Sequence, residues 1–122
     1  MAKKILIVED TADLLANLED FLTMEGYAVI SASNARLALQ ILKTETPDLV
    51  ISDLMMHEMD GFTLVREMKK MPTLKDIPVT IFSAKPLQEY EEIARSLGVR
   101  CCIKKPSTLE YILETIQKLL NE

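Results

Sequence analysis

The sequence lacks the features of a secreted, membrane-spanning or nucleic-acid-binding protein. No apolar run approaches the roughly 20 residues that cross a bilayer, and the N-terminus enters a short apolar run without a cleavage-like segment. Lys and Arg form no cluster, and the formal net charge of −5 is unsuited to contacts with a phosphate backbone. We therefore expect a cytoplasmic protein with no membrane segment and no direct nucleic-acid partner.

Cysteine is also scarce. Cys101 and Cys102 are adjacent, so they cannot connect distant segments by a disulfide and do not have the spacing of a zinc site. We expect free thiols in a reducing compartment. The chain also has no linker-like or low-complexity tract, and 122 residues are enough to bury about two thirds of the unfolded surface in one core. The prediction is a single domain spanning residues 1–122.

Apolar runs alternate with helical patterns along the whole chain. Strands are expected at residues 4–8, 27–32, 49–52, 78–82 and 99–103, and helices at residues 12–25, 34–44, 61–70, 86–97 and 108–121. Pro86 is expected in the first turn of the fourth helix, and Ser107 with Glu110 matches a capping box at the start of the fifth. Continuous apolar strands separated by helices predict a doubly wound α/β fold, with a five-stranded parallel sheet and five helices.

Polar residues follow four of the five expected strands. They are Glu9 and Asp10, Asp53, Ser83 and Lys105. In an open α/β sheet a ligand binds outside the carboxyl ends of the strands, so these side chains are expected at one site. Three carboxylates at one edge repel one another and need a proton or a cation, and hard oxygen ligands suit Mg²⁺ or Mn²⁺.

Asp53 directly follows an apolar strand, where a carboxylate is costly to bury. A metal would offset that cost and prepare Asp53 as a nucleophile for phosphoryl transfer, while Lys105 adds a charge and Ser83 a hydroxyl donor. Each residue alone has a simpler interpretation: a turn or cap for the acids and Ser83, and a surface position for Lys105. Because four of the five strands are followed by a polar residue of a suitable type, a shared phosphoryl-transfer site is favoured over four separate structural roles.

These motifs resemble the receiver domain of two-component response regulators, in particular the single-domain, chemotaxis-regulator type. In order they are "ILIVED", "PDLVISDLMM", "MDG", "IFSAKP" and "GVRCCIKKP". The ordered set is specific and covers nearly the whole chain. The resemblance implies a flavodoxin-like strand order, 2-1-3-4-5. The starting Met1 and short tail favour a stand-alone regulator over a receiver excised from a longer chain.

The resemblance also implies a role for each site residue. Asp53 would be the phosphoacceptor, with Ser83 and Lys105 contacting the phosphoryl group. Mg²⁺ would be bound by Glu9, Asp10, Asp53 and the backbone carbonyl of Met55. Ala84 would leave room for the phosphoryl group, and the Lys105-Pro106 bond would be cis.

As a receiver, the chain would act as a switch and not as an enzyme, except on its own aspartate. It would accept a phosphoryl group from a phosphohistidine of a sensor histidine kinase or phosphotransfer protein. The surface of the fourth helix, fifth strand and fifth helix would then change for an output protein. Leu14 and Tyr111 are candidate partner contacts, with core packing and solvent exposure as the respective alternatives. A monomer or weak dimer is expected.

Three residues depart from the family pattern. Cys102 stands where the family usually has the Tyr or Phe that reports phosphorylation. We expect it to pack as a small apolar residue, with a redox switch as the alternative. His57 replaces the usual Pro in the loop after Asp53, and Lys85 stands near the rim of the site, where side chains influence hydrolysis of the phosphoryl group.

Three other functions use a similar fold or a similar carboxylate. A flavin-binding electron carrier is disfavoured because the acidic loop at residues 9–13 repels phosphate. An aspartate-nucleophile phosphohydrolase would need a further acid-base residue and a cap over the site. A degenerate receiver that binds partners without phosphorylation is favoured by Cys102 alone.

Overall fold

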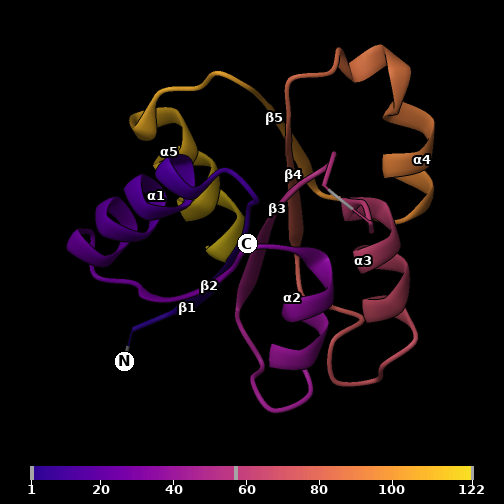
Figure 1. The fold of residues 1–122 in the computed structure, drawn as a ribbon, viewed down its shortest axis with the longest axis horizontal. Helices are drawn as coiled ribbons and strands as arrows, with labels where there is room; N and C mark the ends of the chain where they lie inside the picture. Colours follow the sequence, from indigo (N-terminus) through magenta and orange to yellow (C-terminus); the bar gives the residue numbers. More distant parts are fainter. Residues whose placement is uncertain (1, 57, 122) are drawn as a thin grey trace.

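The computed structural model describes residues 2–56 and 58–121 and shows a parallel sheet between two layers of helices (Figure 1). The strands are β1 (Lys4–Val8), β2 (Ala28–Ala32), β3 (Leu49–Asp53), β4 (Val79–Ser83) and β5 (Cys101–Lys104). Their order is β2-β1-β3-β4-β5, and every neighbouring pair is parallel. The predicted doubly wound α/β class and strand order are therefore confirmed.

The helices divide between the two faces of the sheet. On one side lie α1 (Ala12–Met24) and α5 (Leu109–Leu120), and on the other α2 (Ala35–Ile41), α3 (Gly61–Lys69) and α4 (Glu91–Ser96) (Figure 1). Because strand side chains alternate, Ile5 and Ile7 of β1 join the core under α1 and α5, whereas Leu6 and Val8 join the other. Among the described residues, no helix is long and apolar enough to cross a membrane.

The predicted helix at residues 86–97 is wrong in one respect. A 3-10 helix, η1 (Leu87–Glu89), precedes α4, and Tyr90 separates the two with φ −139° and ψ 7°. Pro86 lies before η1 in extended geometry and not inside a first helical turn. The ring of Tyr90 is buried, and leaving helical geometry at this residue is compatible with its turning into the core.

The predicted start of the last helix is also wrong. The N-cap is Thr108, whose hydroxyl accepts a hydrogen bond from the Tyr111 N–H at 3.1 Å. Ser107 instead donates to the Thr108 carbonyl at 3.4 Å. Both residues are hydroxyl-bearing, so the sequence pattern alone could not choose between them. The remaining boundaries differ from the predicted ones by up to a few residues, with α2 ending at Ile41.

Thr108→Ala is expected to lower the free energy of unfolding by about 1 kcal/mol, because it leaves one N–H at the start of α5 without its cap. Urea unfolding followed by circular dichroism measures the change. Ser107→Ala is the matched control and should have a much smaller effect. Equal losses in the two variants would contradict the assignment of Thr108 as the cap.

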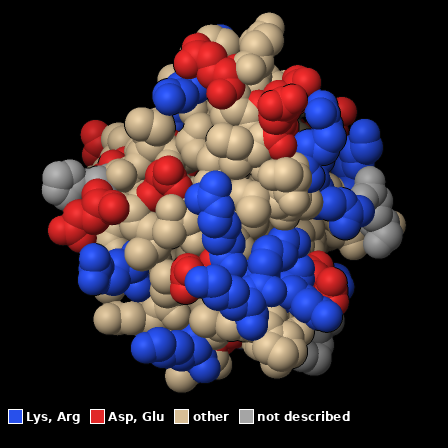
Figure 2. All heavy atoms as spheres, turned by 90° about the vertical axis from the view of Figure 1, so that its right-hand side faces the viewer, with Lys and Arg blue, Asp and Glu red and all other residues tan. Residues whose placement is uncertain are grey.

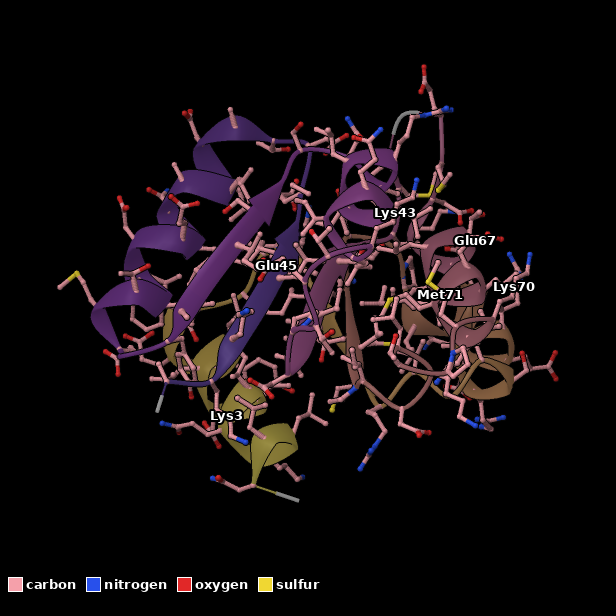
Figure 3. All side chains as sticks on the ribbon, turned by 90° about the horizontal axis from the view of Figure 1, so that it is seen from below. Lys3, Lys43, Glu45, Glu67, Lys70 and Met71 are labelled. Atoms are coloured by element: carbon pink, nitrogen blue, oxygen red, sulfur yellow. The ribbon has the colours of Figure 1, made fainter. Side chains whose placement is uncertain are left out.

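Two ion pairs lie toward the amino ends of the strands, and Glu45, Glu67 and Lys70 from these pairs are labelled in the view from below (Figure 3). Glu67 and Lys70 pair at 2.8 Å at the end of α3, and Lys4 pairs with Glu45 at 2.7 Å. Ion pairs that remain this accessible to solvent contribute at most about 1 kcal/mol each. The charges at the opposite edge of the sheet are buried and therefore matter more.

Candidate functional site

The structure brings the predicted polar residues together at one edge of the sheet: Asp53 and Ser83 are the last residues of β3 and β4, and the others directly follow β1 and β5. One carboxylate oxygen from each of Glu9, Asp10 and Asp53 lies within 4.8 Å of the others. Glu9 is 1% exposed and Asp53 6%, whereas Asp10 is exposed. The parallel register makes this possible, because β1 and β3 run side by side and end at the same level, with Val8 opposite Ser52.

Backbone contacts position the acidic pair. The Glu9 N–H donates to the Ala32 carbonyl at 3.0 Å, which extends the pairing of β1 with β2 by one residue. The Thr11 N–H donates to Glu9 Oε2 at 3.0 Å. The second hydrogen bond turns the Glu9 carboxylate toward the strand ends, and the chain enters α1 directly after it.

Lys105 bridges two of the carboxylates. Its Nζ lies 2.8 Å from Glu9 Oε1 and 3.3 Å from Asp53 Oδ2, and 5.0 Å from the centre of the Phe82 ring. Burial lowers the pKa of Lys105, but its contacts with Glu9 and Asp53 outweigh that effect and the net shift is upward. The ammonium group is therefore held in its charged form beside the acids.

Asp53 retains an unfavourable charge despite this lysine. Burial is the largest cause that raises its pKa, to about 6, followed by repulsion from Glu9, while Lys105 opposes both. A carboxyl with this pKa takes up a proton more readily than usual. A cation at the same place would favour its ionised form, which is the form that can act as a nucleophile.

Ser83 lies at the end of β4 with its hydroxyl next to the following loop. Its Oγ accepts a hydrogen bond from the Lys85 N–H at 3.1 Å, and its carbonyl accepts one from the Lys105 N–H at 2.8 Å. A shallow pocket of about 270 Å³ lies above these groups; its lining includes Asp10, Thr11, Asp53, Met55, Ser83, Ala84, Lys85 and Lys105. Carboxylates, lysine side chains and a hydroxyl-bearing residue therefore line the same pocket.

Gly61 supports the site from behind. It begins α3, and its N–H donates to the Leu54 carbonyl at 2.9 Å. A Cβ added there would lie 2.5 Å from the Asp53 carbonyl oxygen and 3.2 Å from Ile81 Cδ1. The glycine of the "MDG" motif is therefore required by the close approach of α3 to the end of β3.

An apolar pocket of about 350 Å³ adjoins the site. It is lined by Leu14, Phe82, Ala84, Lys105, Pro106 and Ser107. Leu14 also packs partly against the core, which was the alternative to its predicted partner contact; the partner contact stays a prediction. The Lys105-Pro106 bond is cis, as expected.

The structure bears differently on the remaining residues that the sequence singled out. Cys102 is partly buried and packs against the core under α2, α3 and α4, as a small apolar residue would. Tyr111 is 52% exposed and faces away from the core. His57 lies outside the described residues. Sequence reasoning missed Tyr90, which occupies the core beside Cys102; its only signal was an aromatic inside a predicted helix.

Positive charge is unevenly distributed over the surface. Lys and Arg gather over the lower half of the face that carries α3 and α4 (Figure 2). Arg66 and Lys69 stand in the last turn of α3, and Arg95 in the last turn of α4. Positive charge near a helix C-terminus interacts favourably with the helix dipole, so these three side chains are placed to stabilise the ends of their helices.

The fold and the arrangement of this edge place the chain among flavodoxin-like, doubly wound α/β proteins. The family model "Response regulator receiver domain" matches residues 5–117, and the chain belongs to this family. Receiver domains are signalling switches and not conventional enzymes, and they bind Mg²⁺ at an acidic pocket. They act with histidine kinases or phosphotransfer proteins and with output partners.

Relatives and solved structures agree with this family. Chemotaxis protein CheY of Bacillus subtilis is 35% identical over 122 residues, covering 99% of this chain and 100% of that protein. Polar-differentiation response regulator DivK of Brucella anthropi is 30% identical over 122 residues, covering 100% and 99%. The structure of chemotaxis response regulator CheY4 of Vibrio cholerae has a TM-score of 0.92 at 26% identity, covering 98% of this chain and 99% of that chain.

Proposed function

We propose that residues 1–122 form one receiver domain that is phosphorylated on Asp53 in a Mg²⁺-dependent reaction. The observation that carries this proposal is the contact of Lys105 with both Glu9 and Asp53 within the acidic cluster. It supplies a fixed cation next to a buried carboxylate whose pKa is raised. A degenerate receiver would have no need to retain this costly arrangement.

The donor set fits a hard divalent cation. Glu9, Asp10 and Asp53 provide carboxylate oxygens, and Met55, on the rim of the same pocket, is proposed to add its backbone carbonyl. When bound, Mg²⁺ or Mn²⁺ would neutralise negative charge on the phosphoryl oxygens. The exposed position of Asp10 is compatible with an ion that keeps several of its water ligands.

The chemistry follows from the side chains at this edge. A carboxylate oxygen of Asp53 attacks the phosphorus of a phosphohistidine, the O–P bond forms as the N–P bond breaks, and the imidazole leaves with a proton. Lys105 Nζ is close enough to Asp53 to neutralise an oxygen of the transferred group. The Ser83 hydroxyl and the small side chain of Ala84 lie beside the same space.

The apolar pocket beside the site is the proposed contact of the phosphodonor. Leu14, Phe82 and Pro106 offer an apolar surface directly next to Lys105. A sensor histidine kinase or phosphotransfer protein that packs there would bring its phosphohistidine to Asp53. Such donors act in the cytoplasm, where we expect this chain. The output surface is proposed to lie on α4, β5 and α5, and its partner is a protein.

Incubation with acetyl phosphate and Mg²⁺ is expected to add one phosphoryl group. Because an acyl phosphate forms, the added mass should be stable in acid and lost in base, and Asp53→Asn should abolish it. Intact-protein mass spectrometry measures both results. The control is Asp20→Asn, which changes an exposed carboxylate of α1 and should be phosphorylated normally.

Chelation of Mg²⁺ should also prevent the reaction in the wild type. If the folded wild-type protein gains no phosphoryl group from small-molecule donors or from a histidine phosphotransfer protein, the degenerate-receiver alternative replaces this proposal. Phosphorylation that persists in Asp53→Asn would place the acceptor elsewhere.

A further inference from the structure

Basic side chains gather where α3 and α4 end. Residues 66–75 contain four Lys or Arg residues and one Glu, in a chain whose formal net charge is −5. All four basic residues are exposed, on the face over whose lower half Lys and Arg gather (Figure 2). The sequence suggested no basic cluster, but the fold concentrates positive charge at this place.

Lys69 connects the end of α3 to the two segments beside it. Its Nζ donates a hydrogen bond to the Lys75 carbonyl at 2.8 Å. A Cβ built on Gly98, which follows α4, would lie 3.6 Å from the same Nζ. The Gly98 N–H in turn donates to the Arg95 carbonyl at 3.1 Å in the last turn of α4. The ends of α3 and α4 and the loop at residues 70–78 therefore adjoin one another on the surface.

Ion pairs within this surface use only some of its positive charges. Lys70 pairs with Glu67 at 2.8 Å, and Arg95 pairs with Glu91 at 3.1 Å. Three exposed cations form no ion pair with any residue that the structure describes, and they are called the basic patch: Arg66, Lys69 and Lys75. Lys75 lies outside the helices, so the helix dipole does not account for its place.

We propose that the basic patch is a docking surface for an acidic segment of a partner protein. Carboxylates of such a segment would supply the counter-charges that the three cations lack within the chain. Positive charge concentrated on an otherwise acidic protein attracts a partner of opposite charge and raises its rate of association. The same charge disfavours a basic partner, so the patch would also contribute to selection.

Carboxylates beside the basic patch favour a short acidic segment over a nucleic acid or a membrane. Glu67 and Glu91 lie on the same surface, and Asp76, directly after Lys75 in the sequence, is exposed. A long polyanion or an anionic bilayer would bring phosphates against these carboxylates as well as against the cations. A segment with few carboxylates can contact the three cations alone.

The basic patch lies at the opposite end of α3 from Asp53. Helix α3 begins at Gly61, against the Asp53 carbonyl, and its nine residues span about 14 Å. The proposed contact of the phosphodonor, beside Lys105, is at the Asp53 edge. Both surfaces can therefore be occupied together, and the basic patch would hold its partner in both states of Asp53. This inference does not depend on the proposed function.

Binding of a synthetic peptide tests the proposal. The probe is a fluorescein-labelled peptide with six glutamates and no basic residue, and the control probe has glutamine in their place. Fluorescence anisotropy should show binding of the acidic probe alone. Its affinity should fall as NaCl is raised from 50 to 300 mM, because salt screens exposed charges. Amide NMR spectra should show the largest shifts at residues 66–75 and 95–100.

Two double variants provide a matched pair. Arg66→Gln with Lys75→Gln removes two cations that have no ion-pair partner among the described residues, so the fold should be retained. The affinity for the acidic probe should fall about three- to tenfold, as expected for the loss of two exposed ion pairs. Lys3→Gln with Lys118→Gln removes the same charge from exposed positions elsewhere and should bind as the wild type does. Both variants should be phosphorylated on Asp53 at the wild-type rate.

The outcomes separate this inference from its alternatives and from the proposed function. Equal losses in the two double variants would overturn it, because net charge and not the basic patch would then control binding. Tighter binding of single-stranded DNA or of anionic phospholipid vesicles than of the acidic probe would assign the patch to that partner instead. Loss of peptide binding when Mg²⁺ and beryllofluoride, a mimic of the phosphoryl group, are added would overturn its independence of Asp53. A protein that binds the probe but gains no phosphoryl group overturns the proposed function alone.

Discussion

Replacing Asp53 with asparagine is expected to stabilise the folded protein by about 3 kcal/mol at pH 7.5 without divalent metal. The pKa of Asp53 rises from 3.8 to about 6 in the folded state. With about 1.4 kcal/mol for each pKa unit, its ionised form opposes folding by that amount at neutral pH. For a chain of this size, the melting temperature should rise by about 10 °C. Asp53 is 6% exposed, so solvent screens this energy little.

The pH dependence gives the sign of the effect. Because the folded-state pKa is raised, the folded wild type binds the proton more tightly than the unfolded chain does. Its stability relative to Asp53→Asn therefore increases as the pH falls through about 6, and the difference disappears below about 3.8, where both states are protonated. Calorimetry from pH 4 to pH 8 measures the curve.

Two controls separate this effect from general changes in charge. Asp20→Asn removes an exposed carboxylate and should leave the melting temperature nearly unchanged. Mg²⁺ should stabilise the wild type more than Asp53→Asn, since the ionised cluster binds the ion and the unfolded chain does not. A wild type that is more stable than Asp53→Asn at pH 7.5 without metal would contradict the unfavourable charge at Asp53.

Gly61→Ala is expected to destabilise the protein by about 3 kcal/mol, the upper range for forcing extra volume into a packed site. The added Cβ would stand 2.5 Å from the Asp53 carbonyl oxygen. The oxygen is a backbone atom and the Cβ is fixed by the backbone geometry, so neither can rotate away. Alanine is the better helix former by up to about 1 kcal/mol, but the steric effect is larger. Because the clash displaces Asp53, phosphorylation should slow as well.

Gly26→Ala is the matched control for this substitution. Gly26 has a φ of +97°, and a Cβ there meets nothing within 4 Å. Alanine should therefore lower stability by about 1 kcal/mol through backbone strain alone, while leaving phosphorylation unchanged. Urea unfolding and the initial rate of phosphorylation by acetyl phosphate measure the two effects. If Gly61→Ala matched the wild type in stability and in phosphorylation rate, the close packing of α3 against β3 would not be what requires glycine at position 61.

The acidic cluster was predictable because it depends on strand order and on simple alternation. Once parallel strands were expected, Glu9, Asp10 and Asp53 had to meet at the carboxyl edge, and the structure places their oxygens within 4.8 Å. The ion pair of Lys105 with Glu9 was not predictable. It depends on how a flexible side chain crosses from β5 to β1 over Phe82, which the linear pattern does not describe.

The two helix starts that were predicted wrongly have the same kind of cause. Ser107 and Thr108 differ little as capping residues, so the backbone path after β5 decides which hydroxyl meets the Tyr111 N–H. The break at Tyr90 coincides with burial of its ring, which lies 6.0 Å from that of Phe62 in α3. In both places a contact between distant or loop-positioned groups overrides the local pattern.

By itself, the sequence determined the alternation of strands and helices, the doubly wound class and the set of polar residues at the strand ends, because these follow from local hydrophobic periodicity. Only the tertiary structure decided three other features. Position 61 requires glycine because α3 approaches the end of β3 closely, and Lys105 forms ion pairs with both Glu9 and Asp53. Tyr90 is buried in the same core cluster that Cys102 packs against. These features are distances between elements, and a distance between elements is set by packing and not by the order of residues along the chain.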